Sequence, residues 1–209
     1  MPRITEERRA ANRAAIVDAA RRCFARDGFH QTSMPDLVAE AGISAGAFYR
    51  YFSGKEDVVR EIAHEAFGGL GAALLPVLGR DPAPTVAEIV VAVVDTRSAP
   101  TMTIAGREVD LDEQFRLAVQ AWGEVLRLPE LKAEAERSAA MIAGRIAESL
   151  ARGQVQGRVP AAVVPDDAAR FVVALLPGLI MQRTVLGLDT LAVGRAAEGM
   201  LGAPDPPAA

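Results

Sequence analysis

Apolar residues recur along the chain at spacings of three and four, and no window shows the alternation with a period of two that marks a strand. Such spacing gathers apolar side chains on one face of a helix, so it predicts an all-α chain. The expected helices cover residues 6–26, 34–41, 45–52, 85–96, 111–127, 129–152, 166–186 and 190–201, together with a long helix from Lys55 that ends at Pro76. The stretch from Arg97 to Asp110 has no convincing apolar period, which predicts an irregular loop and a candidate lid.

Two short helices joined by a tight turn stand near the start of the chain. Thr32 and Ser33 can cap the first of them, Gly42 ends it, and Ser44 can cap the second. A pair of short helices around a glycine turn predicts a helix-turn-helix, the arrangement that places its second helix in the major groove of DNA.

Charge is distributed unevenly between the two parts of the chain. The 209 residues carry a formal net charge of −4, yet residues 1–60 hold ten Lys and Arg against eight Asp and Glu, or +2, which leaves −6 for the rest. This asymmetry indicates a small unit that binds a polyanion, joined to a larger acidic one. A composition of 50% hydrophobic and 24% charged residues is that of a folded globular protein.

The longest apolar run and the single cysteine indicate the cellular compartment of the protein. The run from Phe171 to Met181 is too short to cross a bilayer, so we expect no membrane partner. Cys23 has no second cysteine with which to form an intramolecular disulfide, a usage that fits the reducing cytoplasm. We therefore expect a cytoplasmic protein in which Cys23 is a small core residue; the alternative is a reactive thiol.

Motifs for catalysis, metals and cofactors are incomplete in this chain. His64 and Glu65 begin like a zinc-protease helix, but Gly68 stands where the second histidine ligand would be. The stretch Gly69-Leu70-Gly71 has no strand before it, unlike a dinucleotide-binding loop. The serine-hydrolase elbow and the phosphate-binding Walker loop are also missing. The sequence therefore predicts neither an enzyme nor a bound metal or cofactor.

The stretch from Ile16 to Val59 carries an ordered set of residues that identifies a family. The matching positions are Ile16, Ala19, Ala20, Phe24, Gly28, Phe29, Thr32, Ser33, Ala41, Gly42, Ser44, Gly46, Phe48, Tyr49, Tyr51, Phe52 and Lys55. In this order they resemble the DNA-binding domain of the TetR family of bacterial transcriptional regulators. The resemblance implies a three-helix DNA-binding domain, expected at residues 1–54, and a larger helical domain for ligand binding and dimerisation at 55–203. We expect the tail 204–209 to be disordered.

The matched residues have chemistry that suits DNA. We expect phosphate oxygens to be met by the polar groups of Thr32, Ser33, Ser44, Tyr49 and Lys55. Ala45 and Gly46 are small enough to let the second helix approach the floor of the groove. Base edges would then be read by Arg50, by Tyr51 or by the backbone near Ala45 and Gly46. For Arg50 the alternative is a solvated or phosphate-facing side chain, and for Tyr51 a place in the core.

Beyond residue 60 the resemblance holds only in outline, so functional residues cannot be carried over one by one. We expect a ligand pocket lined by residues that are alternatively plain core: Phe67, Phe115, Val119, Trp122 and Met141. The apolar run in the helix 166–186 needs cover on more than one side, which predicts a dimer interface formed together with the helix 190–201. The expected interface residues are Phe171, Leu175, Leu176, Leu179 and Gln182.

The resemblance implies a sequence-specific repressor that binds a palindromic operator in double-stranded DNA as a homodimer. A small hydrophobic ligand would release it by shifting the dimer to a spacing that no longer fits the DNA. The alternative is a DNA-binding regulator of the same fold that has no small-molecule ligand and is controlled by a protein partner. An enzyme fused to a helix-turn-helix has no support in the motifs.

Overall fold

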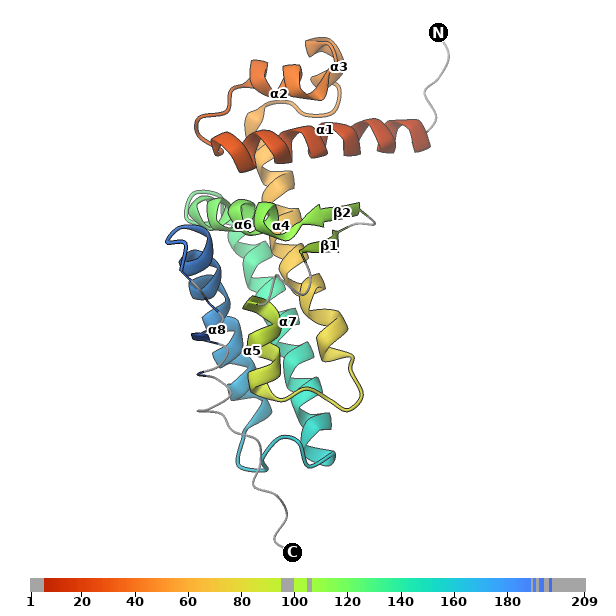
Figure 1. The fold of residues 1–209 in the computed structure, drawn as a ribbon. Coiled ribbons are helices and arrows are strands. Elements are labelled where there is room, and N and C mark those ends of the chain that lie inside the picture. Colours follow the sequence, from red (N-terminus) through yellow and green to blue (C-terminus); the bar gives the residue numbers. More distant parts are fainter. Residues whose placement is uncertain are drawn as a thin grey trace, which may run out of the picture.

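The chain folds into a helical protein with its helix-turn-helix at one end (Figure 1). This computed structural model describes residues 6–94, 100–104, 107–188, 190, 192–193 and 196. The helices in these ranges are α1 (Glu6–Asp27), α2 (Met34–Ala41), α3 (Ala45–Phe48), α4 (Lys55–Leu78), α5 (Val86–Val94), α6 (Leu111–Val125), α7 (Pro129–Val155) and α8 (Pro165–Thr184). A two-stranded sheet, β1 (Thr101–Ile104) and β2 (Arg107–Asp110), precedes α6.

The helices form two layers that α4 connects. In Figure 1, α1, α2 and α3 make up the upper end, and α4 runs down from them alongside α5, α7 and α8, while α6 crosses beneath α1. The mostly helical architecture is confirmed, and every expected helix after residue 80 that the structure describes begins and ends within a few residues of its expected bounds. None of the helices described is long and apolar enough to cross a membrane.

Two expected segments fall largely outside the described residues. The helix expected at 190–201 is described at isolated positions only, and the tail 204–209 is not described. Neither prediction is therefore tested here by the fold.

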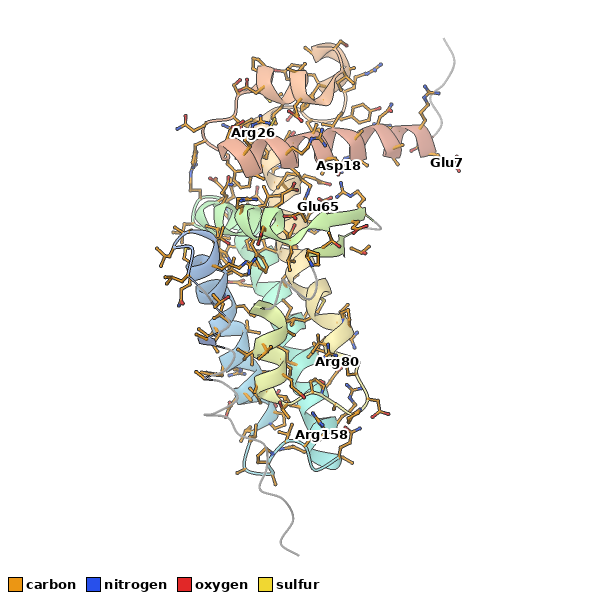
Figure 2. The ribbon with its side chains drawn as sticks, in the orientation of Figure 1. Glu7, Asp18, Arg26, Glu65, Arg80 and Arg158 are labelled. Carbon is orange, nitrogen blue, oxygen red and sulfur yellow. The ribbon has the colours of Figure 1, made fainter. Side chains whose placement is uncertain are left out.

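The segment before α6 forms a β-hairpin, so the irregular loop expected at 97–110 is wrong for the part that is described. β1 and β2 pair antiparallel along their full length. β1 does alternate, as Thr-Met-Thr-Ile, but only over four residues, and β2, Arg-Glu-Val-Asp, has a single apolar residue, so the pattern was too short to be recognised as a strand. Ion pairs of Arg107 with Asp18 on α1 and with Glu65 on α4 anchor the hairpin between the two layers (Figure 2).

α4 continues past Pro76, where the sequence predicts its end. Pro76 lies in the last turn, and the helix ends at Leu78. The carbonyl of Leu78 accepts hydrogen bonds from the Ser149 hydroxyl at 3.0 Å and from Arg152, both on α7. Pro76 lacks the N–H that would bond the carbonyl four residues before it, so it removes one backbone hydrogen bond, and the helix nevertheless continues for two residues.

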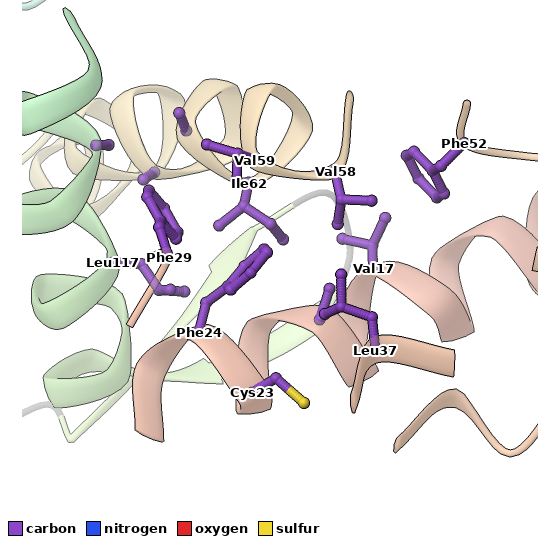
Figure 3. Packing of buried hydrophobic residues seen from close by; sticks show 14 of the residues in the cluster. Val17, Cys23, Phe24, Phe29, Leu37, Phe52, Val58, Val59, Ile62 and Leu117 are labelled. Atoms are coloured by element: carbon purple, nitrogen blue, oxygen red, sulfur yellow. The ribbon is translucent and has the colours of Figure 1, made fainter. Parts of the chain in front are cut away.

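One hydrophobic cluster joins the helix-turn-helix to the rest of the chain (Figure 3). It contains Phe24 and Leu37 of the helix-turn-helix, Ile62 of α4 and Leu117 of α6, all fully buried. The domain boundary expected after residue 54 therefore falls within a continuous core. A second cluster, built by α4, α5, α7 and α8, fills the other end of the molecule.

Cys23 belongs to the first cluster. Its side chain is fully buried, and this burial raises the pKa of the thiol. A buried thiol is a poor nucleophile because the reactive thiolate is disfavoured. The prediction that Cys23 is a small core residue is confirmed.

Candidate DNA-binding interface

Side-chain caps and one left-handed glycine set the geometry of the helix-turn-helix. The Ser33 hydroxyl accepts a hydrogen bond from the Asp36 N–H at 3.3 Å, and the Asp36 carboxylate accepts one from the Ser33 N–H at 2.8 Å. The Ser33 hydroxyl, and after it the Ser33 N–H, hold the pKa of Asp36 below its usual range. Gly42 ends α2 at a φ of 65°, where a side chain would be strained. Ser44 then caps α3 by accepting from the Ala47 N–H at 3.2 Å, so the predicted caps at Ser33 and Ser44 are confirmed.

α3 is shorter than the expected span 45–52. The regular helix ends at Phe48, and the N–H groups of Tyr51 and Phe52 bond the Phe48 carbonyl at 2.9 and 3.2 Å. The chain therefore continues in a tight turn after the helix. The buried rings of Phe48 and Phe52 lie 6.0 Å apart and fix the orientation of α3 on the core.

An exposed surface combines the start of α3 with the turn that follows it; we call it the α3 surface. It consists of the exposed residues Ser44, Ala45, Gly46, Tyr49 and Arg50. Tyr49 is 52% exposed, and Arg50 has no hydrogen-bond or ion-pair partner among the described residues. A Cβ added at Gly46 would meet nothing within 4 Å, so the space in front of the helix is open. Partnerless polar side chains beside small residues suit contact with another molecule.

Two of the expected phosphate contacts already have partners within the protein. Thr32 is 2% exposed and its hydroxyl donates to the Gly28 carbonyl at 2.8 Å, so this side chain is turned into the protein rather than toward solvent. Ser33 is exposed, but its hydroxyl donates to Asp36 at 2.6 Å, which places a carboxylate beside it. The Gly28 carbonyl, just after the end of α1 at Asp27, also accepts the Thr32 N–H at 3.3 Å, so both groups of Thr32 close one turn between α1 and α2.

Tyr51 and Lys55 stand at the edge of the α3 surface. Tyr51 is half-buried against the first cluster, and its hydroxyl accepts a hydrogen bond from Asn12 at 3.1 Å, which favours the core alternative over base reading. The Lys55 ammonium donates to the His30 carbonyl at 3.0 Å. An ammonium has three hydrogens, so Lys55 keeps donors for a second acceptor.

Among the described residues of 6–60, ion pairs engage at least five of the basic side chains. The paired residues are Arg13, Arg21, Arg22, Arg26 and Arg60. Lys55 bonds a carbonyl rather than an acid, and among the described residues Arg9 and Arg50 have no partner. Positive charge available to a polyanion is therefore concentrated at a few positions, two of them on or beside the α3 surface.

Three polar side chains, which we call the α6 junction, hold α6 against the helix-turn-helix: Arg21, Gln114 and Gln120. Arg21 is 2% exposed and donates to the Gln114 side chain at 2.8 Å. Gln120 donates to the Phe24 carbonyl at 2.9 Å and accepts from the Phe29 N–H at 2.7 Å. Sequence reasoning missed this junction, although a glutamine within the apolar stripe of a helix is a signal for a buried hydrogen bond.

The five expected pocket residues lie in separate places. Phe67 and Trp122 make an edge-to-face contact with ring centroids 5.3 Å apart. Phe115 and Val119 pack in a different small cluster with α8, and Met141 is exposed. Two described cavities, of about 280 Å³ beside the start of α8 and about 540 Å³ between α1, α4 and α7, are lined by other residues.

The expected dimer residues divide between the interior and the surface. Leu176 and Leu179 are 3% and 4% exposed within the second cluster, so in a single copy they face the chain's own core. Phe171 is 49% exposed, and Leu175 and Gln182 are partly exposed. A helix that packs on its own core must bury one face, and an apolar composition all round does not reveal which face that is.

The described residues include no group of three or more His, Cys, Asp or Glu side chains placed to hold a metal ion. His64, from the incomplete zinc motif, instead lies 3.3 Å from the Glu134 carboxylate on α7. Its side chain remains largely exposed, which makes the pair a surface contact.

Two family models match the chain. One, described as bacterial regulatory proteins of the tetR family, matches residues 16–62, and the other, the C-terminal domain of BetI-type transcriptional repressors, matches residues 104–201. The HTH-type transcriptional regulator YfiR of Bacillus subtilis (strain 168) is 43% identical over 61 residues, which are 29% of this chain and 30% of YfiR. The chain spans about a third of the length of the curated relatives it matches.

Solved structures share the fold over most of their length. The reduced form of E. coli NemR superposes with a TM-score of 0.71 at 17% identity and covers 94% of this chain and 100% of its own. FadR of Bacillus subtilis, solved in complex with stearoyl-CoA, has a TM-score of 0.56 at 18% identity and covers 90% of this chain and 96% of its own. At such identities the likeness establishes the fold. Because the two models together match more than half of its residues, the chain belongs to the TetR family of bacterial transcriptional regulators.

Proposed function

We propose that this protein represses transcription in the cytoplasm by binding a palindromic operator as a homodimer, and that a small apolar ligand releases it. The observation that carries the proposal is the α3 surface, where small residues at the start of the helix are followed by an exposed tyrosine and a partnerless arginine. A helix with this profile can enter the major groove, because small side chains permit close approach and long polar ones reach DNA.

In this proposal residues 1–54 contact the operator through α3 as recognition helix. Arg50 reaches a base edge or a phosphate, while Tyr49 and Lys55 meet phosphates beside the groove. Ser44 holds the start of α3 in place through its cap. Few positions on so short a helix can touch bases, so two half-sites read by two copies supply the specificity that one copy lacks.

A second copy is proposed to pack on an exposed stripe of α8, which we call the α8 stripe. It consists of Phe171, Ala174, Gly178, Met181 and Val185, all exposed and separated by spacings of three and four. This spacing is one face of a helix, opposite the buried face that carries Leu176 and Leu179. A continuous apolar stripe on a surface helix needs cover, and a two-fold axis supplies the same stripe from the partner.

A small apolar ligand within residues 55–203 is proposed to control operator affinity. The structural neighbour FadR, solved with stearoyl-CoA, supports a ligand of this kind in a protein of the same fold. α6 contacts α8 through Phe115 and Ile180 on one side and carries the α6 junction on the other. A ligand that displaces α6 would therefore move the helix-turn-helix of each copy and change the spacing of the two recognition helices.

To test the proposal, the full chain is incubated with a library of random DNA duplexes, and the duplexes that it binds are recovered and sequenced. The expected outcome is an inverted repeat with two equal half-sites. A library that stays random after selection at low salt would refute sequence-specific DNA binding. Arg50→Ala should weaken binding of the selected duplex. Arg22→Ala is the matched control, because Arg22 is also an exposed arginine of the helix-turn-helix but pairs with Glu40 at 2.8 Å.

The selected duplex then serves to screen small molecules for release, measured as a fall in fluorescence anisotropy of labelled DNA. A compound that binds the protein and lowers operator affinity supports ligand control. Compounds that bind the C-terminal part and leave operator affinity unchanged would contradict it.

A further inference from the structure

The part of α3 that would enter the major groove carries almost no polar side chains. Ala45 and Gly46, the first two residues of the helix, are exposed and offer one methyl group and one hydrogen atom. Ala47 is half-buried and Phe48 is fully buried in the core. The hydroxyl oxygen of Ser44 accepts the Ala47 N–H as a helix cap. Ser44, just before the helix, keeps its hydroxyl hydrogen as a donor. Beyond it, hydrogen-bonding side chains begin only at Tyr49 and Arg50, after the regular helix has ended.

A methyl group can read only one feature of the major groove. The base edges there present hydrogen-bond donors and acceptors, except for the C5-methyl group of thymine, which is apolar. Cytosine has a hydrogen atom at the same place. An exposed alanine methyl at the start of a recognition helix is thus complementary to thymine and has no favourable contact with the other three bases.

We propose that Ala45 is a specificity-determining residue that reads the methyl group of one thymine in each half-site. This inference rests on the proposed function, with α3 in the major groove. Gly46 assists because a Cβ at that position would project into open space in front of the helix, where it would hold the backbone away from the bases. Ala47 is excluded as the reader because its side chain is turned partly toward the protein.

Removal of the methyl group from DNA tests the inference without altering the protein. Thymines of the duplex recovered by selection are replaced one at a time by deoxyuridine, which pairs identically and lacks only the C5-methyl group. Each half-site should contain one thymine whose replacement lowers the affinity of the full chain about fourfold, which is the effect of exposing one buried methyl group. Replacement of both of these thymines in one duplex should lower the affinity about fifteenfold. If no thymine is sensitive while the unmodified duplex binds tightly, the inference is overturned and the proposed function stands.

Two variants assign the effect to a residue. Ala45→Gly should bind the thymine and deoxyuridine duplexes with equal affinity, because the methyl that reads the base is gone. Ala47→Gly is the matched control, because it causes the same loss of helix propensity in the same turn. It should still bind the thymine duplex more tightly than the deoxyuridine duplex. Discrimination that persists in Ala45→Gly would overturn the role of Ala45. A selection that enriches no sequence at all would instead overturn the proposed function.

Discussion

Replacement of Lys55 by Gln should weaken binding to every DNA sequence alike and reduce the salt dependence of binding. Lys55 begins α4 beside the α3 surface, and its ammonium donates to the His30 carbonyl at 3.0 Å. Gln retains a donor for that carbonyl and removes the positive charge. The variant therefore isolates the charge of Lys55 from its hydrogen bond.

The number of phosphates that Lys55 and Arg50 neutralise sets the expected magnitude. If Lys55 and Arg50 of each copy neutralise one phosphate apiece, the dimer neutralises about four, and log K falls against log salt with a slope of about −3.6. A rise in salt from about 50 to about 200 mM should then weaken the unmodified protein about 150-fold. With Lys55→Gln in both copies the slope should be about −1.8, and the same rise in salt should weaken binding only about 12-fold.

Fluorescence anisotropy titrations of the selected operator and of a scrambled duplex, each at several salt concentrations, measure these slopes. Arg22→Gln serves as the control, because Arg22 is paired with Glu40 and its replacement should leave the slope unchanged. An unchanged slope in Lys55→Gln, together with an altered preference between the two duplexes, would refute a phosphate contact by Lys55.

Four further predictions concern base reading, dimerisation, core packing and acid stability. Arg50→Ala should cost about 1–3 kcal/mol at one base position of each half-site if Arg50 reads guanine, and an equal loss across a panel of single-base variants would assign Arg50 to the phosphates instead. Met181→Glu on the α8 stripe should give a folded monomer in sedimentation, and a dimer that survives the change would place the interface elsewhere. Leu176→Ala should instead lower the free energy of unfolding by about 2–5 kcal/mol, because Leu176 is buried in the chain's own core; a loss below this range in denaturant titrations would contradict that placement. Because the pKa of Asp36 is lowered, the capping box stabilises the fold above about pH 4 and loses this effect as the pH falls through the folded-state pKa. Ser33→Ala should therefore flatten the acid side of a plot of thermal-unfolding temperature against pH. A plot identical to that of the unmodified protein would count against the cap.

Local signals in the sequence were sufficient where one side chain and its own backbone decide the structure. Ser33 and Ser44 cap their helices and Gly42 adopts the left-handed conformation, because each interaction spans only a few residues. Thr32 shows the limit of such reasoning. It has the same chemistry as Ser33, but its position on the buried side of the turn directs its hydroxyl to a carbonyl rather than to solvent.

Features that depend on contacts between distant segments could not be read from the sequence. Arg107 meets partners on α1 and α4, and no local pattern announces a hairpin held by such long-range pairs. The buried face of α8 could not be identified for a related reason. Leu176 and Phe171 are equally apolar in the sequence, and only the packing of α8 against α5 and α7 buries one and exposes the other.

The core that the helix-turn-helix shares with α6 constrains how regulators of this design can exchange parts. Leu117 and Ala121 of α6 complete the packing around Phe24, so a chimera that joins the first 54 residues of another regulator to this chain would set an unmatched surface against them. Replacement of the first 54 residues alone should therefore give chimeras that misfold or whose helix-turn-helix packs weakly on the rest of the chain, unless α6 is replaced as well. The α3 surface is free of this constraint, because residues such as Ala45 and Arg50 are exposed. Point substitutions on α3 can therefore change the DNA-contacting surface without disturbing the core that the helix-turn-helix shares with α6.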